Sequence, residues 1–235
     1  MQYIKHVALT LFVFMGLSLT GFSAMAEPEG PHQRIEKTTA SLLVLIEEAK
    51  IYFDKDPDRF YRELTTIIDP LVDFKSFTRS VMGDYGTRAY YSSLNKEQKT
   101  QYKKDYQRFI GRFKAGLVNT YGKGLLAFGG QKIQVVAPDA EAQKAIAAKK
   151  SVTVKQEIQG SEKTYTLEYK MRPSKQGEWL LRNVSIEGIN IGQLYRNQFM
   201  SAMDANKGDF AAVIDNWVVD AKDLKAESGE SEKTK

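Results

Sequence analysis

The sequence contains no cysteine and only two histidines, His6 and His32. Without cysteine the chain forms no disulfide and cannot carry the lipid anchor of a lipoprotein, so its stability must come from a packed core. Zinc sites and nucleophilic triads draw on cysteine and histidine as ligands or bases. Since His6 lies among the first 26 residues and His32 in the flexible lead-in that follows them, we expect no metal site, no cofactor and no such triad.

A glycine-rich phosphate loop and a strong charge of one sign are also missing. No glycine-rich loop follows a strand in a βαβ pattern, which argues against nucleotide binding. Lys5 is the only charged residue among the first 26, so the rest of the chain has 33 basic and 29 acidic residues and a net charge of +4. This excess is small and dispersed, and we therefore expect no nucleic-acid partner.

The one long apolar run lies at the N-terminus. Val7 to Phe22 carries no charge, Lys5 precedes it, and the small residues Ala24 and Ala26 form a signal-peptidase site. We interpret residues 1–26 as a signal peptide cleaved before Glu27, which places the protein in the periplasm. The alternative is a retained membrane anchor, but the run is short for a span of about 20 residues.

Apolar residues recur with helical spacing through the first half of the remaining chain. The pattern predicts a helix over about 34–53, after a flexible lead-in. A long helix with an aromatic stripe runs to about Tyr121, and Gly111 and Gly116 within it suggest that something packs closely there. Three helix starts are marked by capping or proline signals: Asp56-Pro57, Asp69-Pro70, and Asn95 with Gln98.

The spacing then changes to period 2, which is typical of strands. Strands are expected over about 131–187, with turns at Gly160 and near Gly177, followed by two helices. This order predicts an α+β fold in which a curved antiparallel sheet of four to five strands packs against several helices. We expect a single domain over 27–221 and a disordered charged tail over 222–235.

Carboxylates are the remaining candidates for catalysis. Asp69 and Asp73 are four residues apart and would share a helix face, as an acid and base pair requires. Helix capping is the better explanation of both residues, with Asp69 as the cap and Asp73 in the first turn. Glu187 precedes Gly188 and fits a turn. We therefore expect no catalytic residue.

A specific pattern begins at Trp179. A strand led by this residue ends at Glu187-Gly188, and a helix follows that contains Tyr195-Arg196 and Phe199. This resembles the MlaC family of toluene-tolerance auxiliary proteins, which are periplasmic phospholipid-binding carriers.

The resemblance extends over nearly the whole chain after residue 26, with three departures. Tyr90 stands where the family often has Trp, Asn183 where Asp is common, and Asn190 where Ser is usual. The matching segments are Asp69 to Gly83 with Tyr90-Tyr91, the helix from Gln98 to Tyr121, and the strand Tyr165 to Arg172.

The resemblance implies an apolar lipid pocket between the sheet and the long helices. Leu181 and Val184 should lie on opposite strand faces, so at most one should point inward. Arg196 is expected to meet a lipid phosphate, a partner surface or only solvent. The expected lipid-binding residues are Val81, Met82, Phe109, Phe113, Leu117, Tyr121, Tyr165, Leu167, Tyr169, Leu181, Val184, Ile189, Ile191, Tyr195 and Phe199.

The function implied by the resemblance is phospholipid transport that maintains outer-membrane lipid asymmetry. The implied partners are phospholipid as cargo, an inner-membrane ABC transporter complex and an outer-membrane lipoprotein complex, with the carrier as a monomer. Two alternatives stay open, because periodicity cannot tell a filled core from a hollow one. One is a carboxylate-based enzyme with a cone-shaped pocket, and the other is an interaction module with a solid core.

Overall fold

Capping side chains define the starts of most helices in the computed structural model, which describes residues 29–126, 130–161 and 163–219. Asp56 accepts a hydrogen bond from the Arg59 amide at 3.0 Å, and Asn95 forms a capping box with Gln98, as the sequence predicted. The helices of the first half are α1 (Pro31–Tyr52), α2 (Pro57–Ile68), α3 (Phe74–Val81), the 3₁₀ turn η1 (Gly83–Gly86), α4 (Arg88–Ser93) and α5 (Lys96–Leu125).

Two expected helix starts are wrong. Asp73, not Asp69, caps α3: its carboxylate accepts from the Ser76 amide at 2.9 Å, while Asp69 ends α2. His32 is not in a flexible lead-in but in the first turn of α1, because Pro31 occupies the first helical position, where its missing N–H costs nothing.

The sheet has the predicted antiparallel α+β form, with strand order β1-β2-β3-β4-β5. Turns at Gly160 and Gly177 join its central strands, and Gly177 has the positive φ of 90° that such turns favour. A short helix between the first two strands was not predicted. The remaining elements are β1 (Lys132–Val135), α6 (Ala140–Ala147), β2 (Val152–Gln159), β3 (Thr164–Pro173), β4 (Trp179–Ile186), β5 (Ile189–Asn190), α7 (Ile191–Ala205) and α8 (Phe210–Asp215).

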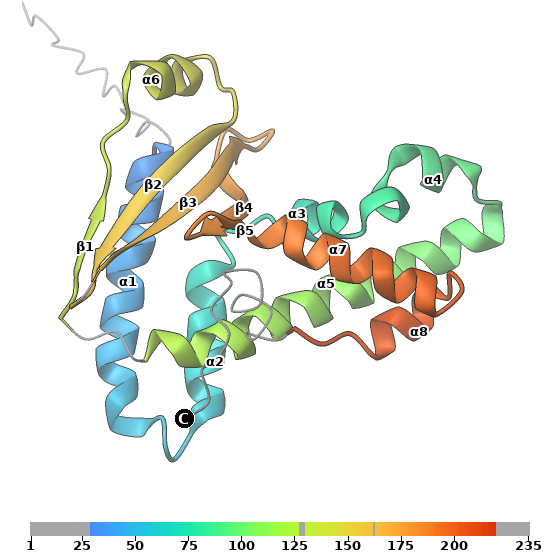
Figure 1. Ribbon diagram of the computed structural model, residues 1–235, viewed down its shortest axis with the longest axis horizontal. Coiled ribbons are helices and arrows are strands. Elements are labelled where there is room, and N and C mark those ends of the chain that lie inside the picture. The colour runs from blue at the N-terminus through green and yellow to red at the C-terminus, as the bar shows by residue number, and fades with distance from the viewer. Residues whose placement is uncertain (1–28, 127–129, 162, 220–235) are drawn as a thin grey trace, which may run out of the picture.

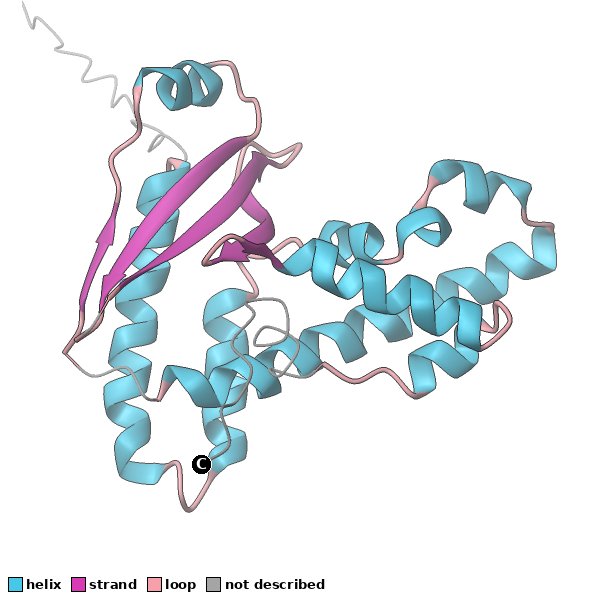
Figure 2. Cartoon of the chain, viewed as in Figure 1, coloured by secondary structure: helices cyan, strands magenta, loops and turns pink. Residues whose placement is uncertain are grey.

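The strands gather at one end of the molecule, and the other end is built from helices alone (Figure 2). At the sheet end, α1 crosses one sheet face (Figure 1). At the helical end, α3 and α8 pack on α5, and α7 contacts α5 through aromatic side chains. Helix α5 runs from the helical end toward α1 and α2 and so connects both parts (Figure 1). The buried apolar residues accordingly form three clusters, of which the largest fills the helical end.

The close approach inferred from the α5 glycines exists at one of the two positions. A Cβ on Gly116 would lie 2.6 Å from the Val219 side chain, whereas a Cβ on Gly111 would meet nothing within 4 Å. Gly116 is therefore required by packing, and Gly111 is not.

Two predicted segments, the signal peptide 1–26 and the charged tail 222–235, lie outside the described residues. Among the helices that are described, none is long and apolar enough to cross a membrane.

Candidate functional site

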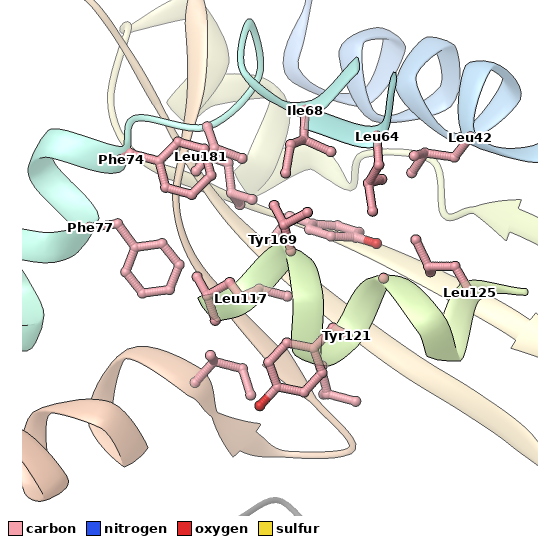
Figure 3. A pocket seen from close by; sticks show the side chains of 16 residues that line it. Leu42, Leu64, Ile68, Phe74, Phe77, Leu117, Tyr121, Leu125, Tyr169 and Leu181 are labelled. Atoms are coloured by element: carbon pink, nitrogen blue, oxygen red, sulfur yellow. The ribbon is translucent and has the colours of Figure 1, made fainter. Parts of the chain in front are cut away.

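An apolar cavity of about 250 Å³ lies where α2, the C-terminal half of α5 and the sheet meet (Figure 3). Among the residues that the structure describes, no charged side chain lines it, and the only side-chain polar atoms in the lining are two tyrosine hydroxyls. The cavity is therefore suited to a hydrocarbon ligand, and the described lining residues include no carboxylate, imidazole or amine. The lining residues are Leu42, Leu64, Ile68, Val72, Phe74, Phe77, Leu117, Val118, Tyr121, Gly122, Leu125, Tyr169, Leu181, Val184, Ile186 and Ile191.

Both tyrosine hydroxyls bond to protein groups. The Tyr169 hydroxyl donates to Gln156 Oε1 at 2.7 Å, and the Gln156 amide donates to Thr39 on α1 at 2.8 Å. Burial raises the pKa of Tyr169 above its usual range, so this hydroxyl stays protonated. The Tyr121 and Tyr195 hydroxyls lie 2.5 Å apart. The tyrosines therefore present their rings to the cavity, while their polar ends tie the wall together.

A β-bulge shapes the sheet wall. Met171 pairs with Leu181 but Lys170 pairs with Asn183, so Arg182 is an extra residue in β4. The linker between α2 and α3 holds this distortion, because the Leu181 amide donates to the Leu71 carbonyl at 2.8 Å. The extra residue shifts the alternation, and Leu181 and Val184 both face the cavity. The expectation that at most one of them points inward was therefore wrong.

Six of the predicted lipid-contact residues line the cavity, and they come from α5, β3, β4 and the start of α7. Whether they contact lipid remains a prediction. These six are Leu117, Tyr121, Tyr169, Leu181, Val184 and Ile191.

Nine predicted residues do not line the cavity. Tyr165 is 41% exposed on β3, and Leu167 and Ile189 are partly buried outside the cavity lining. The other six belong to the solid core of the helical end, where ring pairs such as Phe109–Phe199, with centroids 5.1 Å apart, fill the space. These six are Val81, Met82, Phe109, Phe113, Tyr195 and Phe199.

The sequence reasoning missed the lining residues contributed by α1, α2 and α3. Leu64, Ile68, Phe74 and Phe77 belong to the part of the chain where apolar residues recur with helical spacing, but such spacing indicates only which helix face is covered. Nothing in the pattern distinguished a covered face from one that faces a cavity.

The candidate carboxylates are engaged elsewhere. Lys114 donates to Asp69 at 2.5 Å, and Asp73 forms an ion pair with Arg182 at 3.0 Å. Glu187 accepts from the Thr166 amide at 2.5 Å. These three acids do not form a cluster, and none of them lines the cavity. The geometry gives no support to a carboxylate-based enzyme.

The strand-to-helix junction after β4 is tied together by two asparagines. The Asn183 side chain donates to Asn190 Oδ1 at 2.8 Å and accepts from the Gly192 amide at 2.9 Å. Asn190 also caps α7 by accepting from the Gln193 amide at 2.9 Å. Two of the three departures from the family pattern, Asn183 and Asn190, therefore bond to each other. Arg196 is half-buried on α7 and does not line the cavity.

Comparison with known proteins finds similarity over most of the chain. A family model described as MlaC protein matches residues 36–218. The toluene tolerance protein ttg2D of Pseudomonas putida is 33% identical over 206 residues, which cover 87% of each chain. The solved structure of a phospholipid-binding protein from Ralstonia solanacearum, in complex with a phospholipid, aligns with a TM-score of 0.59. That alignment has 18% identity and covers 80% of this chain and 94% of the other, and it shows a shared fold.

Proposed function

The chain belongs to the MlaC family, and we propose that it is a periplasmic carrier whose apolar cavity receives the acyl chains of a phospholipid. The observation that carries this proposal is a cavity of about 250 Å³ between the sheet and α5, whose described lining residues include none with a charge. The relative from Ralstonia, which shares the fold, is described as binding a phospholipid. Members of the family are lipid-binding carriers and not enzymes.

The energetics of acyl chains explain why a carrier must enclose them. Burying one methylene is favourable by about 0.8 kcal/mol, so exposing about 30 methylenes of two acyl chains to water would cost more than 20 kcal/mol of free energy, on the order of 24 kcal/mol. The bilayer and the cavity are similarly apolar, so transfer between them is close to balanced. Direction must then come from partners, which we propose to be an inner-membrane ABC transporter complex and an outer-membrane lipoprotein complex. The carrier itself acts as a monomer.

The cavity is smaller than the roughly 300–1,000 Å³ in which drug-sized ligands are usually held. Loading of a two-chain lipid therefore requires its walls to move apart. The headgroup stays near solvent, because the lining offers no charge to pair with a phosphate.

We further propose that residues 1–26 direct export to the periplasm and that the carrier is the single domain over 27–221. In this compartment the protein would take part in maintaining outer-membrane lipid asymmetry.

The direct test is native mass spectrometry of protein expressed in a bacterial periplasm and purified without detergent. We expect a bound mass that matches a diacyl phospholipid and that organic extraction recovers. A protein that is folded, has the mass of the polypeptide alone and yields no extractable lipid would overturn the proposal.

A further inference from the structure

A second cavity, of about 450 Å³, lies at the opposite end of α5 from the lipid cavity, between α3, α4 and the first turns of α5. Figure 1 shows that this end, where α4 meets α5, is the extremity of the molecule farthest from the sheet. We refer to this cavity as the basic cleft. It is lined by Arg79, Arg88 and Lys103 together with Tyr91, Tyr102 and Tyr106, and by Gly86 and Thr87.

Two of the three cations of the basic cleft lie near aromatic rings. The Arg79 guanidinium lies 5.4 Å from the Tyr106 ring centre, and the Lys103 ammonium lies 6.0 Å from that of Tyr91. No carboxylate of the described residues lies within ion-pair distance of Arg79, Arg88 or Lys103. The cleft is therefore a concave surface with uncompensated positive charge, which favours an anionic ligand.

Two of the three tyrosines of the cleft, Tyr102 and Tyr106, offer ring surface rather than free hydroxyls. The Tyr102 hydroxyl donates to the Tyr85 carbonyl at 2.9 Å, and the Tyr106 hydroxyl donates to the Lys75 carbonyl at 2.5 Å. A Cβ on Gly86 would lie 2.1 Å from the Arg79 carbonyl oxygen, so a glycine is needed where these segments meet. A ligand that fits must combine negative charge with apolar surface.

We propose that the basic cleft binds an acidic segment of a protein partner, with carboxylates against Arg79 and Arg88 and apolar side chains against the tyrosine rings. Arginine and tyrosine are the residues that contribute most strongly to protein–protein interfaces. The proposal goes beyond lipid carriage and does not depend on it.

Two other occupants fit the geometry less well. The cargo headgroup is too far away, since Lys103 and Leu117 are separated by 14 residues of α5, or about 21 Å. A membrane surface would be engaged by exposed apolar side chains, but those among the described residues lie on α1, on β3 and at Val218.

The test is an NMR titration of the intact protein with a short peptide of Glu, Asp, Phe and Leu, beside the same peptide with Gln and Asn in place of the acids. We expect the acidic peptide to shift resonances of the basic cleft and to bind more weakly as salt rises from about 20 to about 300 mM. Arg79→Gln and Arg88→Gln should each weaken binding by about threefold or more. Arg172→Gln, which removes an exposed arginine on β3, should leave the affinity unchanged.

Three results would overturn the proposal. The first is that the resonances of the basic cleft do not shift at about 1 mM acidic peptide, a concentration at which binding with a Kd of about 1 mM would be visible. The second is equal binding of the amide peptide. The third is a preference of the cleft for inorganic phosphate or for phosphatidylglycerol vesicles, which would assign it to phosphate groups. Native mass spectrometry of the same variants measures their lipid occupancy, so the lipid cavity is tested independently of the basic cleft.

Discussion

Replacing Leu117 by tryptophan should expel the cargo without unfolding the protein. Leu117 projects from α5 into the lipid cavity (Figure 3), so an indole at this position would enter space that is not filled by protein. The matched control is Leu194→Trp on α7. Leu194 is 7% exposed and packs within the solid core of the helical end, where the same added atoms have no room.

The expected stability difference follows from the cavity. An unfilled volume costs about 24 cal/mol per Å³, so about 250 Å³ corresponds to about 6 kcal/mol in the lipid-free protein. By the same relation, an indole that fills about 100 Å³ of the cavity would raise the free energy of unfolding by about 2.4 kcal/mol. Overpacking at Leu194 should instead cost about 1–3 kcal/mol. The lipid-free variants should therefore differ by about 3–5 kcal/mol in their free energy of unfolding.

The expected loss of lipid is also large. Each methylene kept out of the cavity forfeits about 0.8 kcal/mol, so excluding about four of them weakens binding more than about a hundredfold. The assays are urea unfolding of delipidated protein and native mass spectrometry of protein purified without detergent. A folded Leu117→Trp variant with full lipid occupancy would refute the assignment of the cavity. Equal destabilisation by Leu117→Trp and Leu194→Trp would show that the space is not free.

Three further substitutions test other parts of the structure. Gly116→Ala should lower the free energy of unfolding by about 1–3 kcal/mol in a denaturant titration, because its Cβ would approach a packed side chain to 2.6 Å, while Gly111→Ala should raise it by up to about 1 kcal/mol. Asp73→Asn keeps a capping side chain on α3 but removes the partner of Arg182, so unfolding should become easier by about 1–3 kcal/mol with lipid occupancy unchanged; a hydrolytic activity lost with this change would favour an enzyme. Burial raises the pKa of Tyr102 from 10 to about 12, so the folded state holds this proton more tightly than the unfolded state. Stability should accordingly be lost as the pH rises from 10 to 12, and Tyr102→Phe should lose less over that range; an identical pH dependence would contradict this.

Local signals in the sequence predicted most elements of the fold. Asp56 and the Asn95–Gln98 pair identified helix starts, because a cap depends on residues that are close in sequence. The error at Asp69 shows the limit of such signals. Asp69-Pro70 and Asp73 both suit a helix start, and the choice depends on the linker after α2, which pairs with β4 far along the chain.

The candidate site was predicted in part, because its outline depends on contacts distant in sequence. The α5 stripe from Phe109 to Tyr121 was correctly placed on one helix face. Its first half is covered by α7 and α8, so Phe109 and Phe113 are core residues, whereas Leu117 and Tyr121 lie at the edge of that cover and line the cavity. The sequence of the α5 stripe alone does not indicate at which residue the packing of α7 and α8 ends.

The bulge at Arg182 also depends on contacts between residues that are distant in sequence. Strand alternation placed Leu181 and Val184 on opposite faces, and one extra residue brings both of them to the cavity. The bulge is held by two hydrogen bonds to the chain between α2 and α3, because the Leu181 amide donates to the Leu71 carbonyl and the Leu181 carbonyl accepts from the Asp73 amide. The same linker supplies the cavity residue Val72. The linker therefore prevents β4 from continuing as a regular strand and at the same time forms the adjoining wall. Substitutions in this linker should thus change the shape of the cavity before they change the secondary structure.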